Sequence, residues 1–172
     1  MSTTIQDIRK NELLDAAKSK FGFIPNVLKQ MATSPAALEV YMGGQEALGN
    51  EGNRLTPEQR NFVQLAVSQR NGCDYCTAAH AAMGKMQGSN ADDVKALATG
   101  NPIAEDAGGA YVDAAFLIMD KQGHLGGQDL SRLEAQGIDR EKIYEIIGSI
   151  AIKQVSNWVN HIANTKVDAQ FQ

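Results

Sequence analysis

The sequence predicts an all-α fold in a single domain that spans residues 1–172, and three observations support this prediction. Apolar residues recur at the spacing of amphipathic helices in nearly every segment. Strand-like alternation is scarce, and aromatic residues, which favour strands, make up only 6% of the chain. A length of 172 residues is typical of one domain, and no long linker or short-period repeat interrupts the chain.

The N-terminal part of the chain predicts three helices. The first covers residues 5–19. A short helix over residues 25–32 follows, with Pro25 at its first position, where the missing N–H of proline costs no hydrogen bond. Ser34 and Pro35 start the third helix, and the polar run over residues 49–53 forms the loop after it.

The next two predicted helices form the centre of the chain. Thr56 caps the fourth helix, and Gln59, three residues later, completes a capping box. Asn71 and Gly72 end this helix, so the next one covers residues 73–87 and contains both cysteines. Gly84 lies inside that helix, which predicts a close contact with a neighbouring helix because glycine otherwise destabilises a helix interior.

The remaining chain predicts four further helices. Asn90 opens one helix, a second covers residues 106–122 with a loose start at a glycine pair, and a short one leads to Gly137. The last helix begins at Asp139 and carries a long apolar series: Ile143, Ile146, Ile147, Ile150, Val155, Trp158 and Ile162. We also expect the apolar residues around the glycine-rich link to form a subunit contact: Leu125, Leu130, Leu133 and Ile138.

Composition excludes several classes of partner. The chain is 43% apolar and 21% charged, with a net charge of −4, a pI near 5.3 and no run of Lys or Arg, so we expect neither a nucleic acid nor a membrane as partner. The first residues lack a signal-peptide pattern, and the apolar run over residues 143–152 is too short to cross a bilayer. We therefore expect a cytoplasmic protein, in which a C-x-x-C pair is more often catalytic or metal-binding than structural.

Both cysteines fall at the start of a predicted helix, in the segment NGCDYCTAAH. Cys73 and Cys76 are three residues apart, so their side chains share a helix face and lie about 5–6 Å apart, within the range that a disulfide accepts. The positive end of the helix dipole favours the thiolate, which is the form that attacks peroxides and disulfides, although the carboxylate of Asp74 opposes this effect.

His80 lies one helical turn after Cys76, so a neutral imidazole there is placed to accept the Cys76 proton directly or through water. The spacing therefore assigns Cys76 as the attacking thiol and Cys73 as the resolving thiol. In the expected cycle, Cys76 attacks the substrate, Cys73 condenses with the sulfenic acid, and an external dithiol or protein reductant reduces the disulfide. We predict no cofactor for this cycle.

Two other interpretations of the cysteine pair remain open. Cys73, Cys76 and His80 can supply three zinc ligands, with His124 or His161 as the fourth, but a second cysteine pair is missing. The thiols can also be small buried side chains next to a core histidine. A c-type haem site is excluded because Thr77, and not a histidine, follows the second cysteine, and the βαβ units of a thioredoxin domain are absent from the pattern.

The segments LTPEQRNFVQLAVS (residues 55–68) and NGCDYCTAAH (residues 71–80) resemble the core of the carboxymuconolactone decarboxylase superfamily. They are most similar to its alkyl hydroperoxidase D-like (AhpD-like) branch, and the core match covers residues 55–100. The flanking segments GFIPN (residues 22–26) and SNWVNHI (residues 156–162) are similar to a peroxidase-related subgroup. The resemblance implies a single-domain AhpD-like helical fold, a homo-oligomer (dimer, trimer or hexamer), and thiol peroxidase or disulfide reductase activity on a small hydroperoxide.

The same resemblance implies site residues. It makes Cys76 the peroxidatic and Cys73 the resolving cysteine, and it places His80 in a proton relay. The relay glutamate of the family corresponds to Asn61, and a second relay histidine corresponds to Tyr75.

The relay is therefore incomplete in this chain, and we expect low or altered peroxidase activity. Glu58, one turn earlier, is a candidate substitute for the missing glutamate, although a solvated first-turn acid is the simpler interpretation. Tyr75 is a candidate hydrogen-bond donor to a thiolate or peroxide, or a packed aromatic. Two further functions remain alternatives: a lactone decarboxylase-like enzyme, and a non-enzymatic oligomer that senses redox state through its disulfide.

Overall fold

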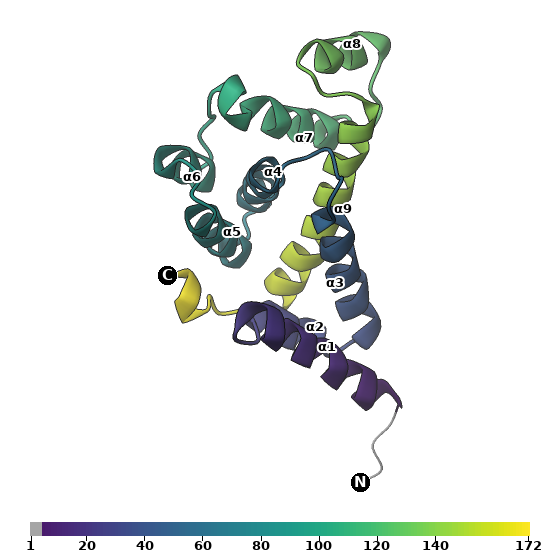
Figure 1. Ribbon diagram of the computed structural model, residues 1–172, viewed down its shortest axis with the longest axis vertical. Helices are drawn as coiled ribbons and strands as arrows, with labels where there is room; N and C mark the ends of the chain where they lie inside the picture. The colour runs from purple at the N-terminus through teal and green to yellow at the C-terminus, as the bar shows by residue number, and fades with distance from the viewer. Residues whose placement is uncertain (1–4) are drawn as a thin grey trace.

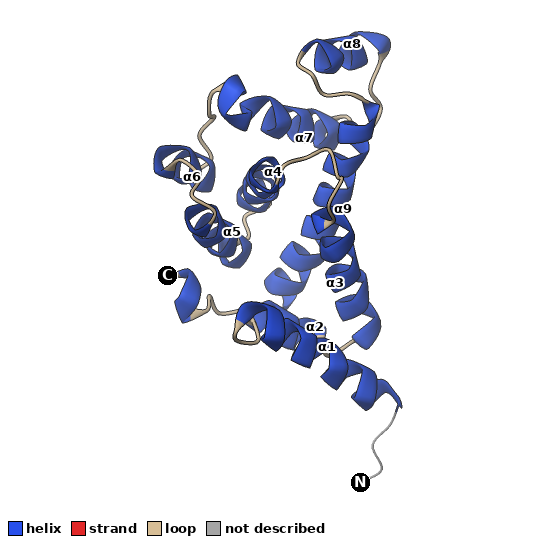
Figure 2. Cartoon of the chain, viewed as in Figure 1, coloured by secondary structure: helices blue, strands red, loops and turns tan. Residues whose placement is uncertain are grey.

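The computed structural model describes residues 5–172, with side chains from Asp7 onward, so residues 1–4 of the predicted domain lie outside the described residues. The described residues form helices and connecting turns without any strand (Figures 1 and 2), which confirms the all-α prediction. The helices are α1 (Ile5–Phe21), α2 (Asn26–Met31), α3 (Pro35–Gly49), α4 (Pro57–Arg70), α5 (Asp74–Met86), α6 (Ala91–Ala98), α7 (Ala110–Asp120), α8 (Gly127–Ala135) and α9 (Arg140–Ala163), with a π-helical turn η1 (Glu105–Gly109) and a 3-10 turn η2 (Ala169–Phe171).

The predicted start signals act as helix caps. The Thr56 hydroxyl accepts the Gln59 N–H at 3.1 Å and the Gln59 side chain accepts the Thr56 N–H at 3.0 Å, so the capping box of α4 is complete. Asn90 and Asp139 cap α6 and α9 through their side-chain oxygens. Pro25 is the N-cap of α2 and not its first helical residue, since its ψ of 141° is extended.

Helix α4 lies at the centre of the fold and contacts α5, α6, α7 and α9 (Figure 1). The long helix α9 runs past it and also contacts α2 and α3. Helices α1 and α8 lie at opposite ends of the long axis of the molecule. Three buried apolar clusters fill the interior, and the cluster that joins α1, α2 and α3 to the first turns of α5 contains both cysteines.

The close contact predicted at Gly84 is confirmed. A Cβ atom at this position would lie 2.9 Å from Val94 Cγ2 and 3.1 Å from Asn61 Nδ2. Glycine therefore lets α5 approach both α6 and α4, and the approach to α4 brings α5 next to Asn61.

One expectation about apolar residues is wrong for two of its four residues. Leu133 and Ile138 are fully buried in the cluster that α4, α7 and α9 share, so these two residues serve the chain's own core rather than a subunit contact. Leu125 and Leu130 pack against this cluster and are partly buried. On α9, two members of the apolar series lie at the surface, since Trp158 is 60% exposed and Ile162 is 84% exposed. None of the helices among residues 5–172 is both long and apolar enough to cross a membrane.

Candidate functional site

The local sequence places the two cysteines at the beginning of α5. Gly72 has a φ of +69°, which reverses the chain after α4, and Cys73 then occupies the N-cap of α5 with φ of −95° and ψ of 90°. Cys76 lies in the first turn, as predicted. Both sulfur atoms therefore lie at the positive end of the helix dipole.

The two thiols are free and buried, but only one of them faces open space. Cys76 lines a cavity of about 340 Å³, and Cys73 lies behind it. The amide of Asn160 donates to Cys76 Sγ at 3.2 Å and lies 3.8 Å from Cys73 Sγ, and Ser156 Oγ lies 3.7 Å from Cys76 Sγ. A substrate in the cavity therefore meets Cys76 first, with Cys73 held within reach on its far side.

The surroundings of Cys76 favour its thiolate. A hydrogen bond donated by the Cys73 thiol is the largest cause that lowers the pKa of Cys76 to about 5. Burial opposes this shift, while the positive charge of Lys153 and hydrogen bonds from Ser156 and Asn160 add to it. The same hydrogen bond, with burial, raises the pKa of Cys73. These opposite shifts favour the thiolate at Cys76 and the protonated thiol at Cys73.

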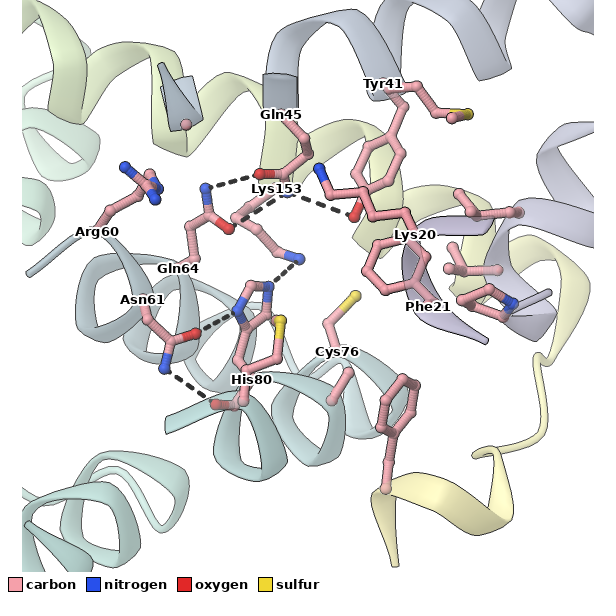
Figure 3. A pocket seen from close by; sticks show the side chains of 18 of the residues that line it. Lys20, Phe21, Tyr41, Gln45, Arg60, Asn61, Gln64, Cys76, His80 and Lys153 are labelled. Atoms are coloured by element: carbon pink, nitrogen blue, oxygen red, sulfur yellow. Dashed lines mark hydrogen bonds between the residues drawn. The ribbon is translucent and has the colours of Figure 1, made fainter. Parts of the chain in front are cut away.

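His80 is fixed between two side chains from other helices (Figure 3). The Asn61 amide nitrogen donates to the His80 carbonyl oxygen at 3.0 Å, and this orients Asn61 Oδ1 toward His80 Nδ1 at 2.8 Å. Since Oδ1 only accepts, Nδ1 carries the proton and Nε2 is left as an acceptor. Lys153 Nζ lies 2.8 Å from Nε2 and donates to it.

The chemical role predicted for His80 therefore changes. Burial, followed by the charge of Lys153, lowers the pKa of His80 well below its usual value, so the imidazole is neutral at physiological pH. It lies in the cavity wall one turn from Cys76, as expected, but its two ring nitrogens bond to Asn61 and Lys153 and not to the thiol. His80 accepts a hydrogen bond from the Lys153 ammonium, and the groups that lower the pKa of Cys76 are Cys73, Lys153, Ser156 and Asn160 rather than His80.

The other two candidates lie outside this arrangement. Glu58 is exposed on the first turn of α4 and does not line the cavity, so the structure does not place it in a relay. Tyr75 lines the cavity, but its hydroxyl donates to Asp168 at 2.5 Å and accepts the Val27 N–H at 3.4 Å. Asp168 also accepts the Asn26 N–H at 3.0 Å, so Tyr75 ties the C-terminal segment and α2 to α5.

The structure brings no further histidine to the cysteines. His124 is exposed in the turn before α8, and His161 is exposed near the end of α9. Among the described residues, no three His, Cys, Asp or Glu side chains gather in a way that could hold a metal ion.

Sequence reasoning did not identify the contribution of α9. Lys153, Ser156 and Asn160 all reach the thiols or His80 from this helix, and Lys153 is only 1% exposed. The sequence does contain a signal for this contribution, a set of polar residues at helical spacing between the apolar residues of the last helix. These polar residues, which form the polar stripe on α9, are Ser149, Lys153, Ser156, Asn157 and Asn160, and all of them are buried.

Solved structures with similar folds support the helical assignment. A peroxidase-related protein described as an alkylhydroperoxidase AhpD core, from Ralstonia eutropha JMP134, has a TM-score of 0.84 and 20% identity, over 99% of this chain and 93% of that one. A peroxidase-related protein from Silicibacter sp. TM1040 has a TM-score of 0.81 and 20% identity, over 98% and 89% of the two chains. The debrominase Bmp8 has a TM-score of 0.70 and 19% identity, over 95% and 88%. The predicted AhpD-like fold is therefore confirmed.

The family assignment comes from the sequence comparison. No functionally curated protein gives a significant sequence match to the chain. The sequence model of the carboxymuconolactone decarboxylase family matches residues 35–121, which include α3 to α7 with both cysteines, His80 and Asn61. This match covers half of the chain, and the protein therefore belongs to the carboxymuconolactone decarboxylase family.

Proposed function

We propose that the protein is a dithiol oxidoreductase that reduces small hydroperoxides at Cys76. The observation that carries this proposal is the asymmetry of the cysteine pair. Cys76 has a pKa of about 5 and lines the cavity, whereas Cys73 keeps its proton and donates to the Cys76 sulfur. A thiolate with a neighbouring thiol in reserve is the arrangement that a peroxide-reducing disulfide cycle requires.

In the first step, the Cys76 thiolate attacks the terminal oxygen of the hydroperoxide. An S–O bond forms, the O–O bond breaks, and Cys76 becomes a sulfenic acid while the peroxide is reduced to an alcohol. The leaving alkoxide needs one proton, and the ammonium of Lys153, which lines the same cavity, supplies it. Lys153 afterwards takes up a proton from the solvent, and Cys76 releases one proton when it ionises again at the end of the cycle, so the protons balance.

In the second step, Cys73 attacks the sulfenic acid, a disulfide forms, and water leaves with the Cys73 proton. The three-residue spacing on one helix face permits this bond. An external dithiol or protein reductant, of the kind that keeps cytoplasmic thiols reduced, then exchanges with the disulfide. This reductant is oxidised by two electrons and restores both thiols.

Turnover of tert-butyl hydroperoxide with dithiothreitol as the reductant tests the proposal. Cys76→Ser should abolish turnover. In the absence of dithiothreitol, Cys73→Ser should consume one equivalent of peroxide and leave a sulfenic acid that dimedone traps on Cys76. Thr77→Ser, next to Cys76 but outside the cavity lining, is the matched control and should keep wild-type turnover. Unchanged turnover in Cys76→Ser would exclude the proposed role.

Two activities named for relatives serve as comparison assays. A carboxylated lactone tests decarboxylation, the activity in the family name, and a bromopyrrole tests debromination, the activity named for Bmp8. Turnover of one of these compounds without any peroxide turnover would replace the proposed function. A change of oligomer size on oxidation without any turnover would instead favour the redox-sensing alternative.

A further inference from the structure

Apart from the Cys76 thiolate, the charged side chains that line the cavity beside Cys76 are all basic. Lys20, Arg60 and Lys153 line it, and among the described residues no Asp or Glu does. The basic character of the lining is opposite to the net charge of the chain, which contains 20 acidic residues and 16 basic ones. We propose that this cavity binds an organic anion, so that the hydroperoxide substrate carries an acidic group in addition to its peroxide; this assignment rests on the proposed function.

The three cations differ in how free their charged groups are to bind an anionic ligand. Lys153 already has two partners, because its ammonium donates a hydrogen bond to His80 and its charge is balanced by the Cys76 thiolate. Lys20 lies at the rim of the cavity, exposed, and its ammonium approaches only the Phe21 ring, at 5.9 Å from the centroid. It forms no ion pair with any described carboxylate.

Arg60 is the second available cation. Its Nη1 donates to the Leu48 carbonyl oxygen at 2.6 Å, and its other N–H groups form no hydrogen bond with the described residues. Burial lowers the pKa of Arg60, and the charge of Glu145 opposes this shift. The Glu145 carboxylate itself accepts the backbone N–H groups of Arg54 at 2.7 Å and Leu55 at 2.8 Å. A guanidinium with free donors on a cavity wall is suited to a carboxylate.

The geometry separates the two ends of such a substrate. Figure 3 shows Arg60 on one side of the view and the Lys20 side chain reaching in from the other side, with the Lys153 ammonium and the Cys76 sulfur near the middle of the view. The neutral peroxide end can approach the thiolate while the anionic end lies away from that negative charge, at Lys20 or Arg60. Apolar side chains supply the rest of the lining: Phe21, Val27, Leu28, Met42, Met83 and Phe171. A volume of about 340 Å³ is suitable for a single aromatic ring or a short chain with one acidic group.

Binding to the reduced protein tests the inference without turnover. Calorimetric titration should show that 4-isopropylbenzoate binds about tenfold tighter than the neutral 4-isopropylbenzamide, as expected for one charge-assisted contact. Added salt should weaken the binding of the benzoate more than that of the amide. Lys20→Gln and Arg60→Gln should each reduce the preference for the benzoate, and the double variant should abolish it.

Lys18→Gln is the matched control, because Lys18 is exposed on α1 but does not line the cavity, and it should keep the preference. In parallel, cumene hydroperoxide with a para-carboxylate should give about tenfold higher kcat/KM than its methyl ester. Equal binding of benzoate and benzamide would overturn this inference, even if both hydroperoxides were reduced. Preferred binding of the benzoate without reduction of either hydroperoxide would support the anion site and refute the proposed function.

Discussion

The Nζ atom of Lys153 lies 2.8 Å from Nε2 of His80, and this contact joins the middle of α9 to the cysteine helix α5. Lys153 is only 1% exposed, and no described carboxylate pairs with it. Its positive charge acts on the Cys76 thiolate, so the lysine and the thiolate compensate each other inside the protein.

Replacing Lys153 tests this compensation. Lys153→Met keeps a long apolar side chain and removes the charge, so the pKa of Cys76 should rise and peroxide turnover at pH 7 should fall by about tenfold or more, because fewer thiolates form and the alkoxide loses its proton donor. The thiolate absorbance at 240 nm and the pH profile of kcat/KM measure the two effects. Lys142→Met, on the same helix but outside the cavity lining, should change neither. An unchanged pH profile in Lys153→Met would refute the role of this charge.

Asn61 should contribute to stability through His80. Asn61→Ala removes the hydrogen bonds to the His80 ring and to its carbonyl oxygen, both buried, so the free energy of unfolding should fall by about 2 kcal/mol. Urea denaturation measures this change. Glu58→Gln is the control, since Glu58 is exposed and lies outside the cavity, and it should leave both stability and turnover unaltered. A large loss of turnover in Glu58→Gln would show that Glu58 takes part in the proton relay.

Tyr75 should hold the C-terminal segment in place. Tyr75→Phe keeps the ring that packs against Phe171 and removes the donor to Asp168, which leaves that buried carboxylate with the Asn26 N–H alone. We expect a loss of about 1–3 kcal/mol in the free energy of unfolding. Amide hydrogen exchange over residues 164–172 should become faster. If exchange stays slow there, the Tyr75–Asp168 hydrogen bond does not fix this segment.

How far the sequence predicts the structure depends on the range of the interactions involved. The capping signals at Thr56 and Asn90 are local, since each satisfies N–H groups within three residues, and the predicted helix starts agree with the structure there. The placement of Cys73 at the N-cap and of Cys76 in the first turn of α5 follows from the same local rules.

The parts that sequence reasoning missed are set by contacts between distant segments. Lys153 is 73 residues from its partner His80, and Asn160 is 84 residues from Cys76. The polar stripe on α9 is visible in the sequence, but its packing against α4 and α5 decides that it faces the thiols. Trp158 shows that apolar character alone does not determine burial, because this residue of the apolar series is 60% exposed on α9.

The outer face of α9 should affect assembly. Tyr144, Ile147, Trp158 and Ile162 are all at least 40% exposed along this helix, and a second copy of the chain is the partner that the predicted homo-oligomer would place there. Trp158→Ser with Ile162→Ser should lower the mass that light scattering measures, with the helical circular dichroism unchanged. Val40→Ser, an exposed apolar residue on α3, is the comparison. An unchanged mass in the α9 variant would exclude this face from the subunit contact.

The ionisation of Cys76 is the central claim, and a pH titration of thiolate absorbance at 240 nm tests it most directly, with Cys76→Ser subtracted as the blank. The account predicts an inflection near pH 5, so that the thiolate and peroxide turnover are lost only as the pH falls through this value. Cys73→Ala should move the inflection upward, because the hydrogen bond from Cys73 is the largest cause of the lowered pKa. An inflection near pH 9 in the wild-type protein, where an ordinary thiol ionises, would contradict the account.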